Sequence, residues 1–224
     1  MLIDLNADLG EGAGHDAELM RWITSANICC GAHAGSPEEM RATVELARRH
    51  GVVIGAHPGY ADRANFGRAD VELAPHAVKS LCFQQIAALV MAGAEVKYMK
   101  PHGALYHRAM RDDGTAWGVA QAAEGFSLPC VGLPESCLAL ACEAFIAEGF
   151  ADRRYRADGA LVSRDQPDAM IVDVREVLEQ VEWLIGERSV RTICVHGDNP
   201  AALEFVRTIR EGLSARGYTF SPFA

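Results

Sequence analysis

Short apolar segments alternate along this chain with longer stretches in which apolar residues recur every three or four positions. The apolar segments are Leu2–Ala7, Ala26–Ala32, Val52–Ala56, Val96–Met99, Leu128–Leu133 and Thr192–Val195, with a weaker candidate around Phe150–Tyr155. They lack a strict alternation of polar and apolar residues, which is typical of strands buried on both faces of a parallel sheet. The pattern therefore predicts six or seven such strands.

The stretches between these segments carry the signals of helices. Ser36 as N-cap, Pro37 at the first helical position and Glu39 at the third predict a helix that ends at about His50. Similar signals predict a helix from Pro75 to Ala92 before Gly93, and a last helix from the cap Asp198-Asn199-Pro200 to Arg216 before Gly217.

Strands and helices alternate over the whole length of 224 residues, which predicts one α/β domain over residues 1–224 with crossover connections. Six or seven parallel strands could close into a barrel or form an open, doubly wound sheet. The periodicity of the sequence does not separate these two arrangements.

Polar side chains follow five of the predicted strands, at the point where each strand ends. They are Asn6, Asp8, His33, His57, Lys100, His102, His196 and Asp198. The carboxyl ends of parallel strands lie on one face of a barrel or sheet, and active sites assemble on that face. We therefore expect these residues to form one site.

Several kinds of chemistry suit this set. Lys100 can neutralise a phosphate or carboxylate, and His57 or His102 can transfer protons. Further candidates for binding an anion are Arg63, Arg68 and Arg153, of which the first and last each follow an aspartate and could equally form a surface ion pair with it. Asp198 is open to two interpretations, a catalytic acid or only the N-cap of the last helix.

The same strand ends carry a candidate metal site. Its oxygen and nitrogen ligands would be Asp8, His33, His57, His102 and His196. Such a set holds a divalent metal in metal-dependent hydrolases. No two of these residues have the i, i+4 spacing of a sharp metal motif, so a metal such as Mg²⁺ stays one of two alternatives.

The glycine-rich segment Gly10–Gly14 follows the first strand and resembles a dinucleotide-binding fingerprint only faintly. Its third glycine comes one position early, and no acidic residue closes a second strand at the expected distance. We predict a flexible turn that lets the backbone approach a ligand. The chain also lacks the phosphate-binding loop G-x-x-x-x-G-K-[ST].

Composition limits the partners of the protein. The formal net charge is −9, which argues against nucleic acid or an anionic membrane surface as a partner. The segment Met1–Asp8 has acids where a signal peptide needs bases, and no stretch approaches the length of a membrane span. The seven cysteines include no C-x-x-C pair, which suits reduced thiols. We expect a cytoplasmic protein.

Seven blocks of the sequence resemble one protein family. They are Ile3–Gly12, Ser25–Gly35, Gly55–Tyr60, Lys100–Tyr106, Phe150–Tyr155, Asp158–Val162 and Cys194–Pro200. In this order, nearly end to end, they resemble the LamB/YcsF family, which was long labelled lactam utilisation and is understood as the A subunit of bacterial 5-oxoprolinase. The chain departs from the family pattern at Ala32, Ser36, Asn65 and His107, none of which is a strand-end acid, histidine or lysine.

The resemblance implies a (β/α) barrel-like fold of about seven parallel strands, akin to the glycoside hydrolase/deacetylase superfamily. It also implies ATP-dependent hydrolysis of 5-oxo-L-proline (pyroglutamate) to L-glutamate in a complex with the B and C subunits. ATP would be the cofactor and a small lactam the substrate. Whether the chain also associates with itself stays open.

We assign chemistry to the strand-end residues on this basis. The catalytic set would be Asp8, His57, Lys100, His102 and Asp198, and the substrate- or phosphate-binding set Asn6, His33, Arg63, Arg68, Arg153 and His196. The lysine and an arginine would neutralise phosphate charge. A histidine would act as general base on the attacking water, oriented by an aspartate.

Two other classes of protein compete with this hypothesis. One is a metal-dependent amidase or deacetylase that acts without ATP. The other is a binding subunit whose partners carry out the catalysis.

Overall fold

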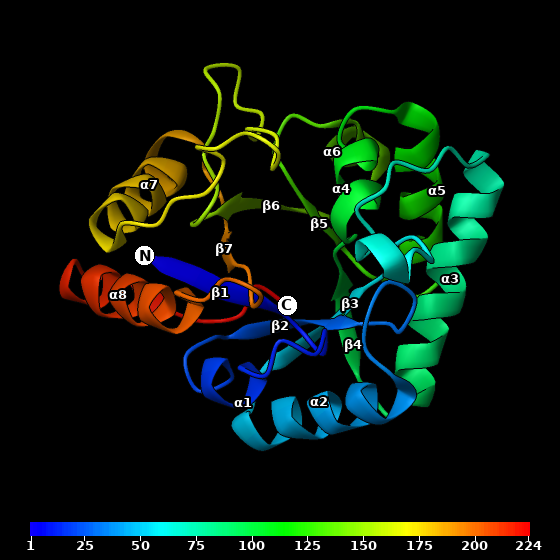
Figure 1. The fold of residues 1–224 in the computed structure, drawn as a ribbon, viewed down its shortest axis with the longest axis horizontal. Helices are drawn as coiled ribbons and strands as arrows, with labels where there is room; N and C mark the ends of the chain where they lie inside the picture. The colour runs from blue at the N-terminus through cyan, green and yellow to red at the C-terminus, as the bar shows by residue number, and fades with distance from the viewer.

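A computed structural model describes all residues from 1 to 224 and shows parallel strands closed into a barrel and surrounded by helices (Figure 1). The strands are β1 (Leu2–Leu9), β2 (Ser25–Cys29), β3 (Val53–His57), β4 (Val96–Met99), β5 (Cys130–Gly132), β6 (Phe145–Phe150), β7 (Thr192–Val195) and β8 (Thr219–Phe220). Strands β1 to β7 follow one another around the barrel, which closes because β1 pairs with both β2 and β7. The short β8 adds to the start of β1. The predicted α/β barrel of about seven parallel strands is confirmed.

Helices cover the outside of the barrel. They are α1 (Asp16–Leu19), α2 (Pro37–His50), α3 (Pro75–Met91), α4 (Gly103–Ala109), α5 (Asp113–Glu124), α6 (Cys137–Ala141), α7 (Val174–Glu187) and α8 (Ala202–Ala215), with a 3₁₀ turn η1 (Arg63–Asn65). Residues 151–173, between β6 and α7, form only isolated bridges and turns. None of the helices is both long and apolar enough to cross a membrane.

Most predicted elements are confirmed, but β2 ends at Cys29 and not at Ala32, and β5 covers only Cys130–Gly132 of the predicted 128–133. Two further predictions are wrong. Helix α2 begins as predicted, with the Ser36 hydroxyl accepting a hydrogen bond from the backbone N–H of Glu39 at 3.1 Å. The weaker strand candidate at 150–155 is wrong, because β6 occupies Phe145–Phe150 and the chain turns immediately afterwards. The predicted Asp198 cap is also wrong, since α8 begins after Ala201 and has no side-chain cap.

The barrel interior is polar, and this polarity positions the site. The carboxylate of Asp4 accepts hydrogen bonds from Ser25, at 2.6 Å, and from Thr192. One layer nearer the carboxyl ends, the Asn27 amide donates to both Asn6 and Asp8 at 2.7 Å. A side-chain network inside the barrel therefore fixes Asp8 where β1 reaches the site.

Close packing on β3 supports this network. The Tyr98 hydroxyl donates to Asn27 Oδ1 at 2.6 Å, and its ring lies directly over Gly55. A Cβ added at Gly55 would lie only 2.1 Å from Cε2 of Tyr98. Glycine at this position is therefore a steric requirement of the buried tyrosine.

Replacing Gly55 with alanine is expected to lower the free energy of unfolding by about 2–3 kcal/mol, since overpacking of a filled core typically has a cost of that order. Urea denaturation of the variant measures this change. Gly186→Ala on α7 is the matched control, because a Cβ there meets no atom within 4 Å. A Gly55→Ala variant as stable as wild type would contradict the close packing of Gly55 and Tyr98.

Candidate active site

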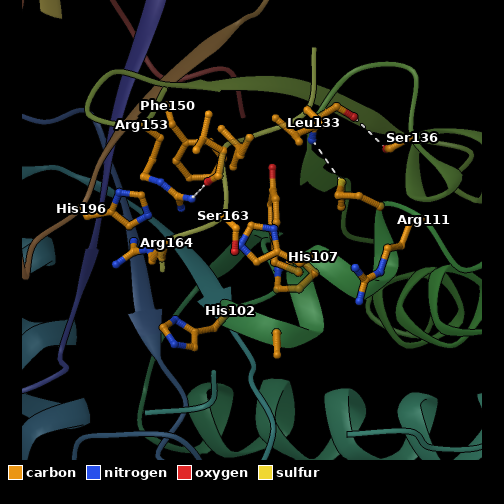
Figure 2. A pocket seen from close by; sticks show the side chains of 18 of the residues that line it. His102, His107, Arg111, Leu133, Ser136, Phe150, Arg153, Ser163, Arg164 and His196 are labelled. Atoms are coloured by element: carbon orange, nitrogen blue, oxygen red, sulfur yellow. Dashed lines mark hydrogen bonds between the residues drawn. The ribbon is translucent and has the colours of Figure 1, made fainter. Parts of the chain in front are cut away.

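A cavity of about 620 Å³ opens at the carboxyl ends of the barrel strands (Figure 2). Its lining includes the sequence-predicted residues Asp8, His57, Arg68, Lys100, His102, Arg153, His196 and Asp198. Asn6, His33 and Arg63 do not line it. The ends of β1, β3, β4 and β7 thus bring most of the predicted residues together, as expected for a parallel barrel.

Lys100 is a buried cation at the floor of the cavity. Its Nζ lies 3.2 Å from Oδ1 of Asp8 and 3.0 Å from Oε2 of Glu148, and it donates to Sγ of Cys194 at 3.0 Å. Burial alone would lower the pKa of Lys100, but Asp8, Cys194 and Glu148 outweigh this effect and raise it well above its ordinary value. Lys100 therefore remains positively charged at neutral pH.

The two carboxylates beside Lys100 differ in their affinity for a proton. Burial alone would raise the pKa of Asp8, but Lys100 and the nearby histidines hold it well below its usual range. Glu148 is fully buried, and neither of its carboxylate oxygens has a partner in hydrogen-bond geometry. Burial raises the pKa of Glu148 despite the neighbouring lysine. Asp8 is therefore the stronger counter-ion of Lys100.

His57 and His102 meet across the floor with unusual hydrogen-bond geometry. Nδ1 of His57 lies 2.8 Å from the carbonyl oxygen of Lys100, and Nε2 of His102 lies 2.9 Å from that of Phe66. A carbonyl oxygen can only accept, so each of these two ring nitrogens carries a proton. The two remaining nitrogens, Nε2 of His57 and Nδ1 of His102, face each other at 3.0 Å, an arrangement that is favourable only with a proton or a cation between them.

Glu11 and His33 complete a cluster around this point. Oε1 of Glu11 lies 3.0 Å from Nε2 of His33 and 3.3 Å from Nδ1 of His102. The His33 ring stacks on His102 with centroids 3.7 Å apart. One donor atom from each of Glu11, His33, His57 and His102 lies within 4.8 Å of the other three, which would suit a metal ion. Burial lowers the pKa of His57 to about 3, which keeps this imidazole neutral and able to bind a cation.

The four donors differ from the set predicted for a metal. Asp8 lies at the edge of the cluster, with Oδ2 3.6 Å from Nε2 of His57, and pairs with Lys100 instead. His196 belongs to a separate pair, in which its Nδ1 lies 2.8 Å from Oδ1 of Asp152. Its ring stacks on Phe150 with centroids 5.1 Å apart. Asp152 therefore holds His196 and does not pair with the adjacent Arg153.

Two predicted binding residues have structural roles outside the cavity. Arg63 donates three hydrogen bonds to carbonyl oxygens of the loop after β2, at Gly31, Ala34 and Gly35. Its guanidinium is therefore committed to that loop and does not reach a ligand in the cavity. Asn6 belongs to the polar barrel interior, where it donates to Thr192 at 2.6 Å.

Asp198 and Arg68 form an ion pair at the outer part of the cavity. Nη2 of Arg68 lies 2.5 Å from Oδ2 of Asp198, and Arg164 lies 3.8 Å from the same oxygen. Both members of the closer pair are partly exposed to solvent. Asp198 therefore orients an arginine at the rim and does not approach the histidines at the floor through any hydrogen bond or ion pair.

Glu11 and Glu148 are two site acids that the sequence analysis missed. Glu11 lies within the glycine-rich segment, where Gly10 and Gly12 adopt positive φ angles of 74° and 82° and the turn directs the glutamate inwards. The signal for Glu11 in the sequence was its position as a single acidic residue between two glycines. Glu148 lies inside β6, and a charged residue within a short apolar strand indicates a site residue. This signal was missed because the strand was predicted at 150–155, after Glu148.

The closed barrel of parallel strands, with a cavity at their carboxyl ends, places the protein in the class of (β/α) barrels. A family 4 carbohydrate esterase from Streptomyces lividans, solved in complex with acetate, has a similar fold, with a TM-score of 0.58 and 13% identity over 100% of this chain and 93% of that one. Within this class, the chain belongs to the LamB/YcsF family, whose model matches residues 3–224.

The relatives of the chain match it over nearly their whole length. A protein from Rhodopseudomonas palustris, named as the A subunit of 5-oxoprolinase, is 43% identical over 100% of this chain and 99% of its own. One of the same name from Staphylococcus carnosus is 41% identical over 99% and 98%. The crystal structure of a lactam utilization protein from Thermus thermophilus has a TM-score of 0.91 and 36% identity over the full length of both chains. The family resemblance predicted from the sequence is confirmed.

Proposed function

We propose that this chain is the A subunit of an ATP-dependent 5-oxoprolinase, which opens the cyclic amide of 5-oxo-L-proline to give L-glutamate. The observation that carries the proposal is the near full-length identity of 41–43% to relatives named for that subunit. The buried lysine–carboxylate pair beside His57 and His102 gives the cavity groups suited to amide hydrolysis. The B and C subunits are the proposed partners, and the cytoplasm is the proposed location.

The chemistry explains why ATP is needed. A five-membered lactam is a poor electrophile, and its opening by water alone provides little driving force. Transfer of a phosphoryl group from ATP to the lactam oxygen leaves ADP and activates the ring carbon. The oxygen of a water molecule then bonds to that carbon, the ring carbon–nitrogen bond breaks, and the nitrogen takes up a proton. A second water releases phosphate.

The floor of the cavity offers a role for each group in this sequence. The Lys100 ammonium would stabilise the negative charge on the lactam oxygen or on its phosphoryl group. Nε2 of His57 would accept the proton of the attacking water in place of its contact with Nδ1 of His102, because Nδ1 of His57 donates to a carbonyl. Asp8, 3.6 Å from that nitrogen, would stabilise the imidazolium that results. Of the two arginines proposed for phosphate, Arg153 lines the cavity and Arg63 does not.

ADP release that depends on 5-oxo-L-proline tests this proposal. The chain alone is expected to be inactive, and the complex with its B and C subunits is expected to release ADP and glutamate in equal amounts. ADP release by the complex without glutamate would contradict lactam hydrolysis. Full activity of the B and C subunits without this chain would make it a non-essential binding subunit.

A second candidate function, a metal-dependent amidase, is favoured by the facing lone pairs of His57 and His102. Two lone pairs at 3.0 Å repel each other unless a proton or a cation lies between them. Glu11, His33, His57 and His102 would hold the cation, and three imidazoles with one carboxylate suit Zn²⁺ or a similar ion better than Mg²⁺. When bound, such an ion polarises a carbonyl and lowers the pKa of water.

Metal analysis separates the two candidates. If the cluster is a metal site, protein purified without chelator is expected to contain about one zinc-like ion per chain by mass spectrometry. The His57→Ala variant would lose this ion, whereas His15→Ala, at an exposed histidine, would keep it. If metal-free protein binds no Zn²⁺ in a calorimetric titration, the cluster is not a metal site, and the His57 and His102 rings share a proton instead.

A further inference from the structure

Arg153 is a buried cation for which the protein supplies no anion. Its side chain lines the cavity and is only 2% exposed. One terminal nitrogen donates to the carbonyl oxygen of Val162 at 2.7 Å, while Nε has no partner and no carboxylate lies within 4.0 Å. Asp152, its neighbour in sequence, is already occupied by His196 and Asn199. A buried guanidinium in this state lacks the counter-charge that such groups normally have.

Two more side chains with unused donors face the same part of the cavity. Arg164 lies no closer than 3.8 Å to its only carboxylate, which Arg68 holds more tightly. His107 makes no side-chain hydrogen bond that would fix its ring, and burial together with Arg153 and Arg164 lowers its pKa to about 4. Figure 2 shows Arg153, Arg164 and His107 among the side chains that line this cavity. Of the other acids of the outer wall, Asp70 pairs with Arg108 and Arg111, Asp158 with Arg156 and Glu135 with Arg188, whereas Asp165 forms no ion pair and contacts none of these three side chains through a hydrogen bond.

We infer that Arg153, with Arg164 and His107, forms a subsite for the carboxylate of the substrate, so that the cavity selects lactams that bear a free carboxyl group. This inference rests on the proposed function and deepens it. A planar guanidinium with free N–H groups matches a carboxylate in a two-pronged arrangement. An anion there would also screen Arg153 from Arg164.

The position of the subsite suits such a substrate. Arg153, Phe150 and Lys100 line the same cavity, and the Phe150 ring lies 4.9 Å from the Lys100 ammonium at the floor. In 5-oxo-L-proline the ring nitrogen is bonded to two ring carbons, one of which bears the carboxylate while the other is the amide carbonyl carbon. A carboxylate bound at Arg153 would therefore direct the carbonyl towards Lys100 and His57.

Kinetics of the complete complex test the subsite. With Arg153→Gln, the KM for 5-oxo-L-proline is expected to rise about 10- to 100-fold, the loss expected for a charged hydrogen bond. The KM for ATP and the activity towards 2-pyrrolidone, the same lactam without a carboxylate, would stay within about twofold of wild type. Arg153→Lys would recover part of the loss. Arg154→Gln removes the same charge from the next residue of the chain, which pairs with Glu176 and does not line the cavity, and would change neither constant.

Two results would overturn the subsite. A rise in the KM for ATP with that for 5-oxo-L-proline unchanged would assign Arg153 to phosphate. An equal loss for both lactams would assign it to chemistry or folding.

Direct binding separates the subsite from the proposed function. If the wild-type complex hydrolyses no 5-oxo-L-proline, the function fails, and calorimetric titration of the complex with glutarate then tests the subsite alone. Binding that weakens at least 10-fold in Arg153→Gln would support it. Binding that is absent from wild type, or equal in the variant, would overturn it.

Discussion

Replacing Lys100 with methionine is expected to reduce turnover of 5-oxo-L-proline by the complex about 1000-fold. Loss of one preorganised charge at a site of developing negative charge typically has an effect of about 10²–10³-fold. The ammonium of Lys100 is also the only cation in contact with the buried carboxylates of Asp8 and Glu148. Its loss should therefore also lower the free energy of unfolding, by about 3–5 kcal/mol, because a buried charge is left without its partner. Steady-state kinetics and urea denaturation measure the two effects.

A second substitution separates chemistry from folding. Adding Glu148→Gln to the Lys100→Met variant removes one of the two carboxylates, and is expected to restore part of the stability but none of the activity. Lys97→Met places the same substitution on an exposed lysine of β4 and should change neither property. Activity that returns together with stability in the double variant would show that Lys100 has only a structural role.

The fold could be predicted from the sequence as far as its elements and their order. Six apolar segments correspond to strands, and the caps of α2 were visible because Ser36, Pro37 and Gly51 act on their own local backbone. Closure of the barrel could not be predicted, since it depends on the pairing of β1 with β2 and β7 together. The polar interior, with Asp4 and Asn27 buried between strands, is likewise a property of the closed barrel.

The site was predictable where a residue lies at the carboxyl end of a strand. Asp8 and His57 lie in the last two residues of β1 and β3, Lys100 and His196 directly follow β4 and β7, and all four line the cavity. The roles of the arginines were not predictable in the same way, because a guanidinium reaches far from its own backbone. Arg63 extends back to the loop after β2, whereas Arg153 lines the cavity and donates to the carbonyl oxygen of Val162. Only tertiary structure shows which carbonyls and carboxylates each arginine meets.

Asp8→Asn is expected to lower turnover about 1000-fold as well, but with a smaller loss of stability than Lys100→Met. The amide retains the shape of Asp8 and removes the charge that would stabilise an imidazolium at His57 and fix the orientation of Lys100. Glu148 remains beside the ammonium, 3.0 Å away, as its counter-ion. The free energy of unfolding should therefore fall by only about 1–3 kcal/mol, the cost of a lost charged hydrogen bond. The exposed Asp168→Asn is the matched control.

The pH dependence of stability gives this substitution a second, independent measurement. The pKa of Asp8 is lower in the folded protein than in the unfolded chain, chiefly because Lys100 outweighs the effect of burial. A lowered folded pKa stabilises the protein above the unfolded pKa of about 4, and this contribution is lost as the pH falls through the folded pKa. In metal-free protein, the difference in unfolding free energy between wild type and Asp8→Asn should thus be largest above about pH 5 and shrink on acidification. A difference that grows towards low pH would contradict an ionised Asp8 as the counter-ion of Lys100.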